Sequence, residues 1–151
     1  MTSTISISID RILESIYALA AVDTLQSPPG RSNVVCRDDA PALRRLVRDS
    51  AAAIIFGITP PVTGSSLSDP SDDGDIITVD LELPEDAVGR LSGTIRPLLE
   101  SALSAQVLCI LWTGTDAGLG DMYMSMVRDA VSSLKRKLSG FGRPGFIHPA
   151  A

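Results

Sequence analysis

The sequence predicts a mainly α protein, a four-helix antiparallel bundle in a single domain, and three observations support this fold class. Four segments repeat apolar residues at spacings of three and four, the period of an amphipathic helix. They lie at about residues 9–25, 40–57, 85–112 and 120–139. Stretches rich in Pro, Gly or Ser separate them, as turns between antiparallel helices require. The 151 residues are 44% hydrophobic and only 4% aromatic, so one domain can bury an aliphatic core.

The first helix is expected to follow a short alternating stretch. Residues 4–9 alternate apolar and polar side chains, which taken alone suggests a strand. A helical pattern begins at once, with Ser8 as a suitable N-cap and Asp10 near the positive end of the helix dipole. The Pro-Pro-Gly of residues 28–30 ends this helix.

The second helix is expected to start after Asp38 or Asp39, either of which can cap it, and to end near Gly57. Its arginines lie opposite the apolar stripe, so they indicate a solvated face. Residues 59–75 are rich in Ser, Pro, Gly and Asp, and we expect them to form a flexible acidic loop.

Residues 76–83 carry the clearest strand pattern of the chain. Four apolar residues alternate with polar ones: Ile77, Val79, Leu81 and Leu83. A single strand must pair with an edge, and residues 2–8 or 32–36 are the candidates within the chain. The other candidate is a neighbouring subunit. Proline and charged side chains normally keep an exposed strand from pairing with another chain, and this segment has no proline and little charge. We therefore expect its apolar face to take part in association.

Two more helices complete the expected bundle. The third begins after Pro84, and Pro97 predicts a kink or a break within it. Residues 107–112 are apolar almost all round and are expected to be the most buried segment. The fourth helix ends in a basic turn, and Gly140 suits the position just after it.

Residues 141–151 are expected to form an extended C-terminal arm, because two Pro and two Gly oppose a helix there. The helical domain would then span residues 1–140. We expect four residues of the arm to contact another subunit: Phe141, Arg143, Phe146 and Ile147.

Residues 113–120 match the glycine-rich phosphate loop of short-chain dehydrogenases. That loop should open a domain of several βα units, but only 31 residues follow it here. No second strand ending in an acidic residue and no YxxxK pair accompanies it. We therefore expect a connection between two helices and no dinucleotide cofactor.

Residues 69–80 resemble an EF-hand loop, with Gly74 at position six and Asp80 at position twelve. Position twelve lacks the bidentate Glu, no helix precedes Asp69, and Pro84 prevents an exiting helix from starting at once. We expect a solvated acidic turn and no calcium site.

The remaining candidates for chemistry are few. His148 is the single histidine and lies in the arm. A Ser-His-Asp or Cys-His relay would therefore depend on a residue that no helix or strand is expected to hold in place. Cys36 and Cys109 are far apart and have no Cys or His neighbours, so no zinc site is expected. We therefore expect a protein that is not an enzyme and holds neither cofactor nor metal.

The charge and the hydropathy of the sequence argue against two classes of partner, nucleic acids and membranes. The net charge of −5 opposes sequence-independent binding to nucleic acid, which needs a surplus of cations. The first ten residues lack the pattern of a signal peptide, and residues 107–112 are too short to span a bilayer. We expect a cytoplasmic protein with no membrane partner and no sequence-specific nucleic acid partner.

The order of elements over residues 76–147 resembles the small neck, or head–tail connector, proteins of tailed bacteriophages and prophages, including their tail-completion relatives. The resemblance rests on an extended segment, a helix ending in an apolar stretch with Trp112, a short turn, an amphipathic helix ending at residues 134–138, and the arm. It implies a helical subunit of a homo-oligomeric ring that is incorporated into a virion or phage-like particle. The alternative is a stand-alone cytoplasmic protein-binding module of the adaptor or immunity type.

Overall fold

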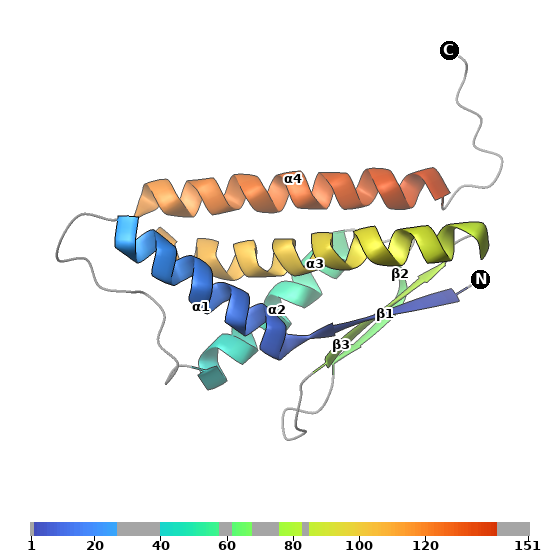
Figure 1. Cartoon of the computed structure of the whole chain (residues 1–151), viewed down its shortest axis with the longest axis horizontal. Coiled ribbons are helices and arrows are strands. Elements are labelled where there is room, and N and C mark those ends of the chain that lie inside the picture. The colour runs from blue at the N-terminus through green and yellow to red at the C-terminus, as the bar shows by residue number, and fades with distance from the viewer. Residues whose placement is uncertain (1, 27–39, 58–61, 68–75, 83–84, 142–151) are drawn as a thin grey trace, which may run out of the picture.

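The computed structural model describes residues 2–26, 40–57, 62–67, 76–82 and 85–141 (Figure 1). Seven elements follow one another: β1 (Thr2–Ser8), α1 (Ile9–Gln26), α2 (Ala40–Gly57), β2 (Val62–Leu67), β3 (Ile76–Glu82), α3 (Glu85–Thr113) and α4 (Ala117–Phe141). The mainly α class and the four predicted helices are confirmed, together with the extended segment that begins at residue 76.

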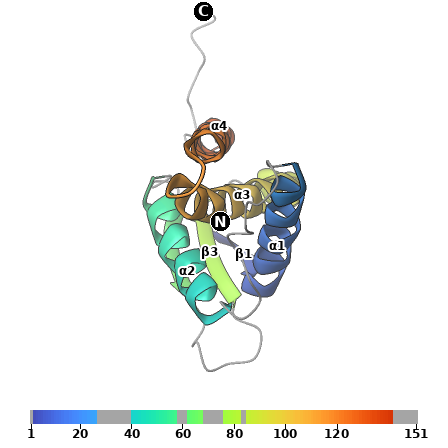
Figure 2. The same cartoon turned by 90° about the vertical axis from the view of Figure 1, so that its left-hand side faces the viewer.

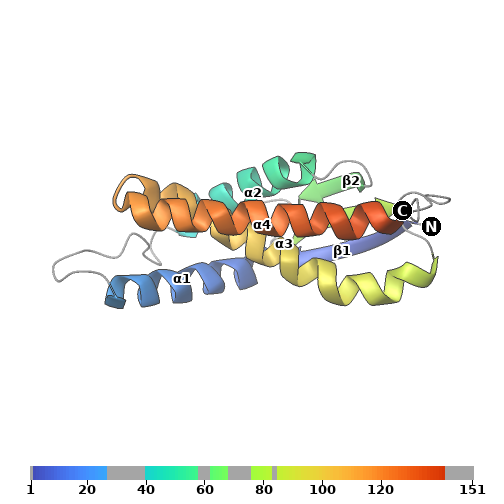
Figure 3. The ribbon, with the colours of Figure 1, turned by 90° about the horizontal axis from the view of Figure 1, so that it is seen from above.

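Helix α3 lies at the centre of the molecule. Figure 2 shows α4 on one side of α3, and α1, α2 and the sheet on the other. Helices α3 and α4 run antiparallel, side by side along the long axis (Figures 1 and 3). The second half of α3 is buried on several sides, as predicted: Leu103, Val107, Leu108 and Trp112 are each at most 2% exposed. A helix that is apolar nearly all round has to be covered on both sides, and this arrangement covers it.

Helix α3 is continuous across Pro97, so no break occurs there. A proline inside a helix removes one backbone donor and crowds the preceding turn, which typically bends the helix. The packing of α3 between α4 and the other elements supplies the contacts that hold it helical on both sides of this residue.

A three-stranded antiparallel sheet, in the order β1-β3-β2, packs against the helices. Strand β3 lies in the middle, with Ile77 opposite Ile7 of β1 and Leu67 of β2. On the inner face, Ile5, Ile7, Ile77 and Val79 are each no more than 2% exposed. Strand β3 is therefore paired on both edges within the chain and does not need a strand from a neighbouring subunit.

This sheet corrects two predictions. Ile77 and Val79 belong to the core and cannot form an association surface, because both are completely buried. Part of the expected loop 59–75 is strand β2, whose sequence Val-Thr-Gly-Ser-Ser-Leu has little apolar alternation to reveal it. Of the other two residues, Leu81 lies in β3 and Leu83 lies outside the described residues.

The end of α4 corrects a third prediction. The helix continues through Gly140 to Phe141, so Phe141 is its last residue and not the start of the arm. Arg143, Phe146 and Ile147 lie outside the described residues.

Within the described part of the chain, one helical stretch is long and apolar enough to cross a membrane. It runs over Gly93–Thr113, with a mean hydropathy of 1.3, and half of it is buried inside the molecule. The prediction from the shorter stretch 107–112 overlooked this longer window. Its place between α4 and the remaining elements gives it the apolar surroundings that a core helix requires.

Candidate interaction site

The glycine-rich stretch that resembled a phosphate loop is the turn between α3 and α4. The carbonyl oxygen of Trp112 accepts hydrogen bonds from the backbone N–H groups of Thr115, at 2.8 Å, and Asp116, at 2.6 Å. Asp116 then caps α4, since its carboxylate accepts the N–H of Leu119 at 3.2 Å. The predicted helix–helix connection is confirmed.

Gly120 makes this turn possible. A Cβ at Gly120 would lie 2.9 Å from the Thr113 hydroxyl oxygen and 3.1 Å from the Thr113 Cα. The first turn of α4 therefore approaches the last turn of α3 too closely for any side chain at this position. The hairpin in turn fixes how α4 lies along α3.

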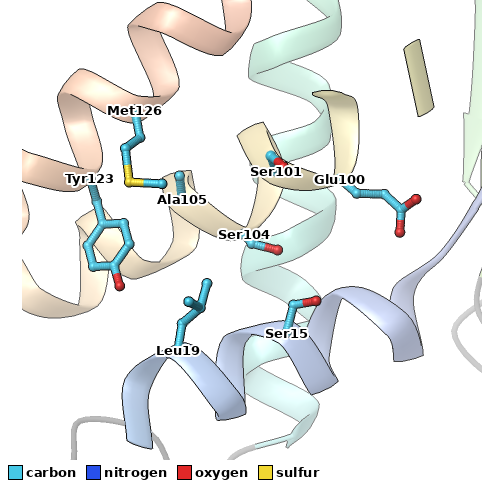
Figure 4. A pocket seen from close by; sticks show the side chains of 8 residues that line it. All are labelled: Ser15, Leu19, Glu100, Ser101, Ser104, Ala105, Tyr123 and Met126. Carbon is cyan, nitrogen blue, oxygen red and sulfur yellow. The ribbon is translucent and has the colours of Figure 1, made fainter. Parts of the chain in front are cut away.

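One groove on the surface lies between α1, α3 and α4 (Figure 4). It has a volume of about 150 Å³ and is lined by Ser15, Leu19, Glu100, Ser101, Ser104, Ala105, Tyr123 and Met126. Figure 4 shows two ends of different character. Leu19, Ala105, Tyr123 and Met126 gather at one end, whereas Ser101 and Glu100 lie toward the other.

Apolar side chains continue from the groove onto the surface beside it. Leu19 of α1 and Met126 of α4 are 39% and 45% exposed. Val22 lies one turn beyond Leu19, and Met122 lies one turn before Met126; these are 48% and 45% exposed. We call these four residues, with Leu25 at 85% exposure, the α1–α4 patch. Contiguous exposed apolar side chains are typical of protein–protein contact sites.

A hydrogen bond joins α1 and α4 at the apolar end of the groove. The Tyr123 hydroxyl donates to the Asp23 carboxylate, and the Tyr123 side chain is almost completely buried. Burial raises the pKa of Tyr123 above its ordinary value of 10.0, and the neighbouring Asp23 carboxylate raises it further. The phenol thus stays protonated at neutral pH and ties the two helices together.

The polar end of the groove carries one carboxylate, that of Glu100. The Glu100 carboxylate lies 3.7 Å from the guanidinium of Arg11, whose side chain is 71% exposed, so this ion pair is weak. The hydroxyl groups of Ser15 and Ser101 lie on either side of the groove and can both donate and accept hydrogen bonds. Such an end suits a basic side chain or a backbone segment.

Of the residues predicted to mediate association, none that the structure describes lines this groove. Sequence reasoning missed Leu19 and Met126 because helical periodicity assigned both to buried stripes. One signal was available in the sequence. Val22 lies three positions from Leu19 and Met122 lies four positions from Met126, so each apolar stripe is wider than a buried face needs.

Within the described residues, no cluster of three His, Cys, Asp or Glu is placed to hold a metal ion. Cys109 is a buried free thiol, 3.9 Å from the Thr113 hydroxyl. Cys36 and most of the acidic stretch 69–80 lie outside the described residues.

Comparisons of the chain with protein-family models, with curated proteins and with solved structures found no match.

Proposed function

We propose that this chain is a non-enzymatic assembly subunit that associates with copies of itself into a ring, of the kind found in the necks of tailed bacteriophages and prophages. The α1–α4 patch carries the proposal. It has five exposed apolar side chains: Leu19 and Met126 line the groove, and Val22, Leu25 and Met122 lie within two turns of them along α1 and α4. Burying such side chains against a second subunit is the usual way to remove this surface from water.

Two features favour a ring over a simple dimer. They are the order of the elements and the separate positions of the α1–α4 patch and the C-terminal arm. Strand β3, the apolar half of α3 with Trp112, the short turn and α4 follow the order of the neck proteins. Met122 and Met126 of the patch lie in the first ten residues of α4, and the arm follows the last residue of that helix. Contacts between two different surfaces of one subunit generate rings when the rotation closes.

Mass in solution tests the proposal. Light scattering on the full chain at micromolar concentration should give a multiple of 15.9 kDa. Deleting residues 142–151 should lower that mass while leaving far-UV circular dichroism and the melting temperature nearly unchanged. The deletion begins at 142 because Phe141 belongs to α4.

A mass of 15.9 kDa at every concentration would contradict the proposal and favour a stand-alone protein-binding module. Capsid and tail genes on either side of the coding sequence would support the neck assignment, and their absence would count against it.

A further inference from the structure

We propose that the groove between α1, α3 and α4 binds the C-terminal arm, residues 142–151, of a neighbouring copy of the chain. This inference rests on the proposed self-association and names the two surfaces that meet. Three observations carry it: the chemistry of the groove, the sequence of the arm, and the distance between the groove and the end of α4.

The groove as a whole has a volume of about 150 Å³, similar to that of a cavity which accommodates benzene, so it has room for one aromatic ring. Leu19, Ala105 and Met126 surround this space (Figure 4). A methionine with rotatable bonds and a polarisable sulfur adapts well to an aromatic partner.

The arm has the complementary sequence. It reads Gly-Arg-Pro-Gly-Phe-Ile-His-Pro-Ala-Ala and contains no acidic residue. Two prolines disfavour a helix and favour an extended chain, which a narrow groove can hold. Phe146 and Ile147 supply apolar side chains, and Arg143 supplies a second cation beside the weak ion pair of Glu100 and Arg11.

The spacing of these groups also agrees. Glu100 and Ala105 are five positions apart on α3, which corresponds to about 7.5 Å along the helix. Arg143 and Phe146 are three positions apart, which in an extended chain corresponds to about 10 Å. A single arm can therefore place its cation near Glu100 and its aromatic ring at the apolar end together.

The arm of the same molecule reaches this contact only when it is almost fully extended. Met126 precedes Phe141 by fifteen positions, so the apolar end of the groove lies about 22 Å back along α4 from the start of the arm. Phe146 is five positions beyond Phe141 and spans at most about 18 Å even when fully extended. The Phe146 ring adds a few ångström to this reach, but the chain would also have to reverse direction at once, so we assign Phe146 to a neighbouring copy.

Cysteine pairing between two variants tests this contact. One full-length variant carries Met126→Cys and the other carries Gly145→Cys, which keeps the neighbouring Phe146 ring. Both have a Cys36→Ser background, and Cys109 stays because it is buried. Mixing the two under mild oxidation should give a disulfide-linked dimer on non-reducing gels. The matched control replaces Met126→Cys with Arg128→Cys, an exposed position on α4 that does not line the groove. The control pair should give at least tenfold less dimer.

The outcomes separate the two proposals. Equal dimer yields from the Met126 and Arg128 variants, in a protein that light scattering shows to be oligomeric, would overturn the groove assignment and leave self-association standing. An intramolecular disulfide in a chain that carries both Met126→Cys and Gly145→Cys, with no mixed dimer, would overturn the assignment to a neighbouring copy. A protein that is monomeric at all concentrations would overturn both proposals.

Discussion

At the scale of single residues, the packing of Gly120 on Thr113 shows how a motif typical of nucleotide binding can have a structural role. The close approach of Gly120 to the Thr113 backbone holds α4 against α3. A side chain at this position would have to push the two helices apart at their shared turn. The spacing of the glycines was visible in the sequence, but only the surroundings of the motif distinguished a helical hairpin from a phosphate loop.

Replacing Gly120 with Ala should therefore destabilise the protein. The new Cβ would meet backbone atoms of Thr113 at 3.1 and 3.3 Å, and overpacking of this kind costs about 1–3 kcal/mol. Urea unfolding at neutral pH measures the loss. Gly114→Ala is the matched control in the same turn, because a Cβ there meets no atom within 4 Å. The prediction is wrong if the two variants unfold at the same urea concentration.

Tyr123 couples stability to pH in a predictable direction. Its pKa is higher in the folded protein than the ordinary value of 10.0, so the unfolded chain releases this proton first as the pH rises. The contribution of Tyr123 to the free energy of unfolding is therefore fully present below pH 10. Above pH 10 it falls by up to about 1.4 kcal/mol per pH unit. The Tyr123→Phe variant should lose less stability than the wild type between pH 10 and 11. If the two proteins lose the same free energy of unfolding between pH 10 and pH 11, this prediction is wrong.

At the scale of elements, strand β3 shows what alternation can and cannot predict. The alternation of Ile77 and Val79 with polar residues correctly located a strand, because a pleated strand points successive side chains to opposite faces. Alternation does not identify the pairing partner. Strand β1 was one of two internal candidates, and β2 was hidden in a polar segment, so the central place of β3 could not be derived.

Because β3 is central, neighbouring isoleucines in it should respond very differently to truncation. Ile77 is completely buried, whereas Ile76 is 42% exposed. Ile77→Ala should cost about 2–5 kcal/mol, since it removes buried methyl groups and leaves a cavity. Ile76→Ala should stay within about 0.5 kcal/mol of the wild type. Thermal unfolding of both variants measures the difference. If Ile77→Ala unfolds at the same temperature as the wild type, Ile77 lies at the surface and the prediction is wrong.

The helices were predicted closely, because each has a long apolar period and clear ends. The packing order was not predictable, since four amphipathic helices fit several arrangements. Helix α3 lies at the centre because its second half is apolar on more than one side. That central place leaves α1 and α4 on either side of it, with the groove between them. The groove is thus a consequence of packing order, which explains why no local motif revealed it.

At the scale of the whole molecule, exposed apolar side chains occur at more than one place, and they allow a controlled test of the α1–α4 patch. Val22 and Met122 flank the groove, with 48% and 45% exposure. Ile110 of α3 is similarly exposed, at 46%. It lies nine positions from Ser101, which corresponds to two and a half helical turns, so it faces away from the groove.

Placing lysines at Val22 and Met122 together should weaken self-association at least tenfold, because the loss of about 1.4 kcal/mol of apolar burial suffices for that factor. Sedimentation velocity over a range of concentrations measures it. The melting temperature of the dissociated chain should hardly change, since substitutions at exposed positions usually shift stability by no more than about 0.5 kcal/mol. Ile110→Lys should leave the association unchanged. If Ile110→Lys weakens association as much as the double variant, the contact between subunits involves the other flank of α3, and the α1–α4 patch is not the principal interface.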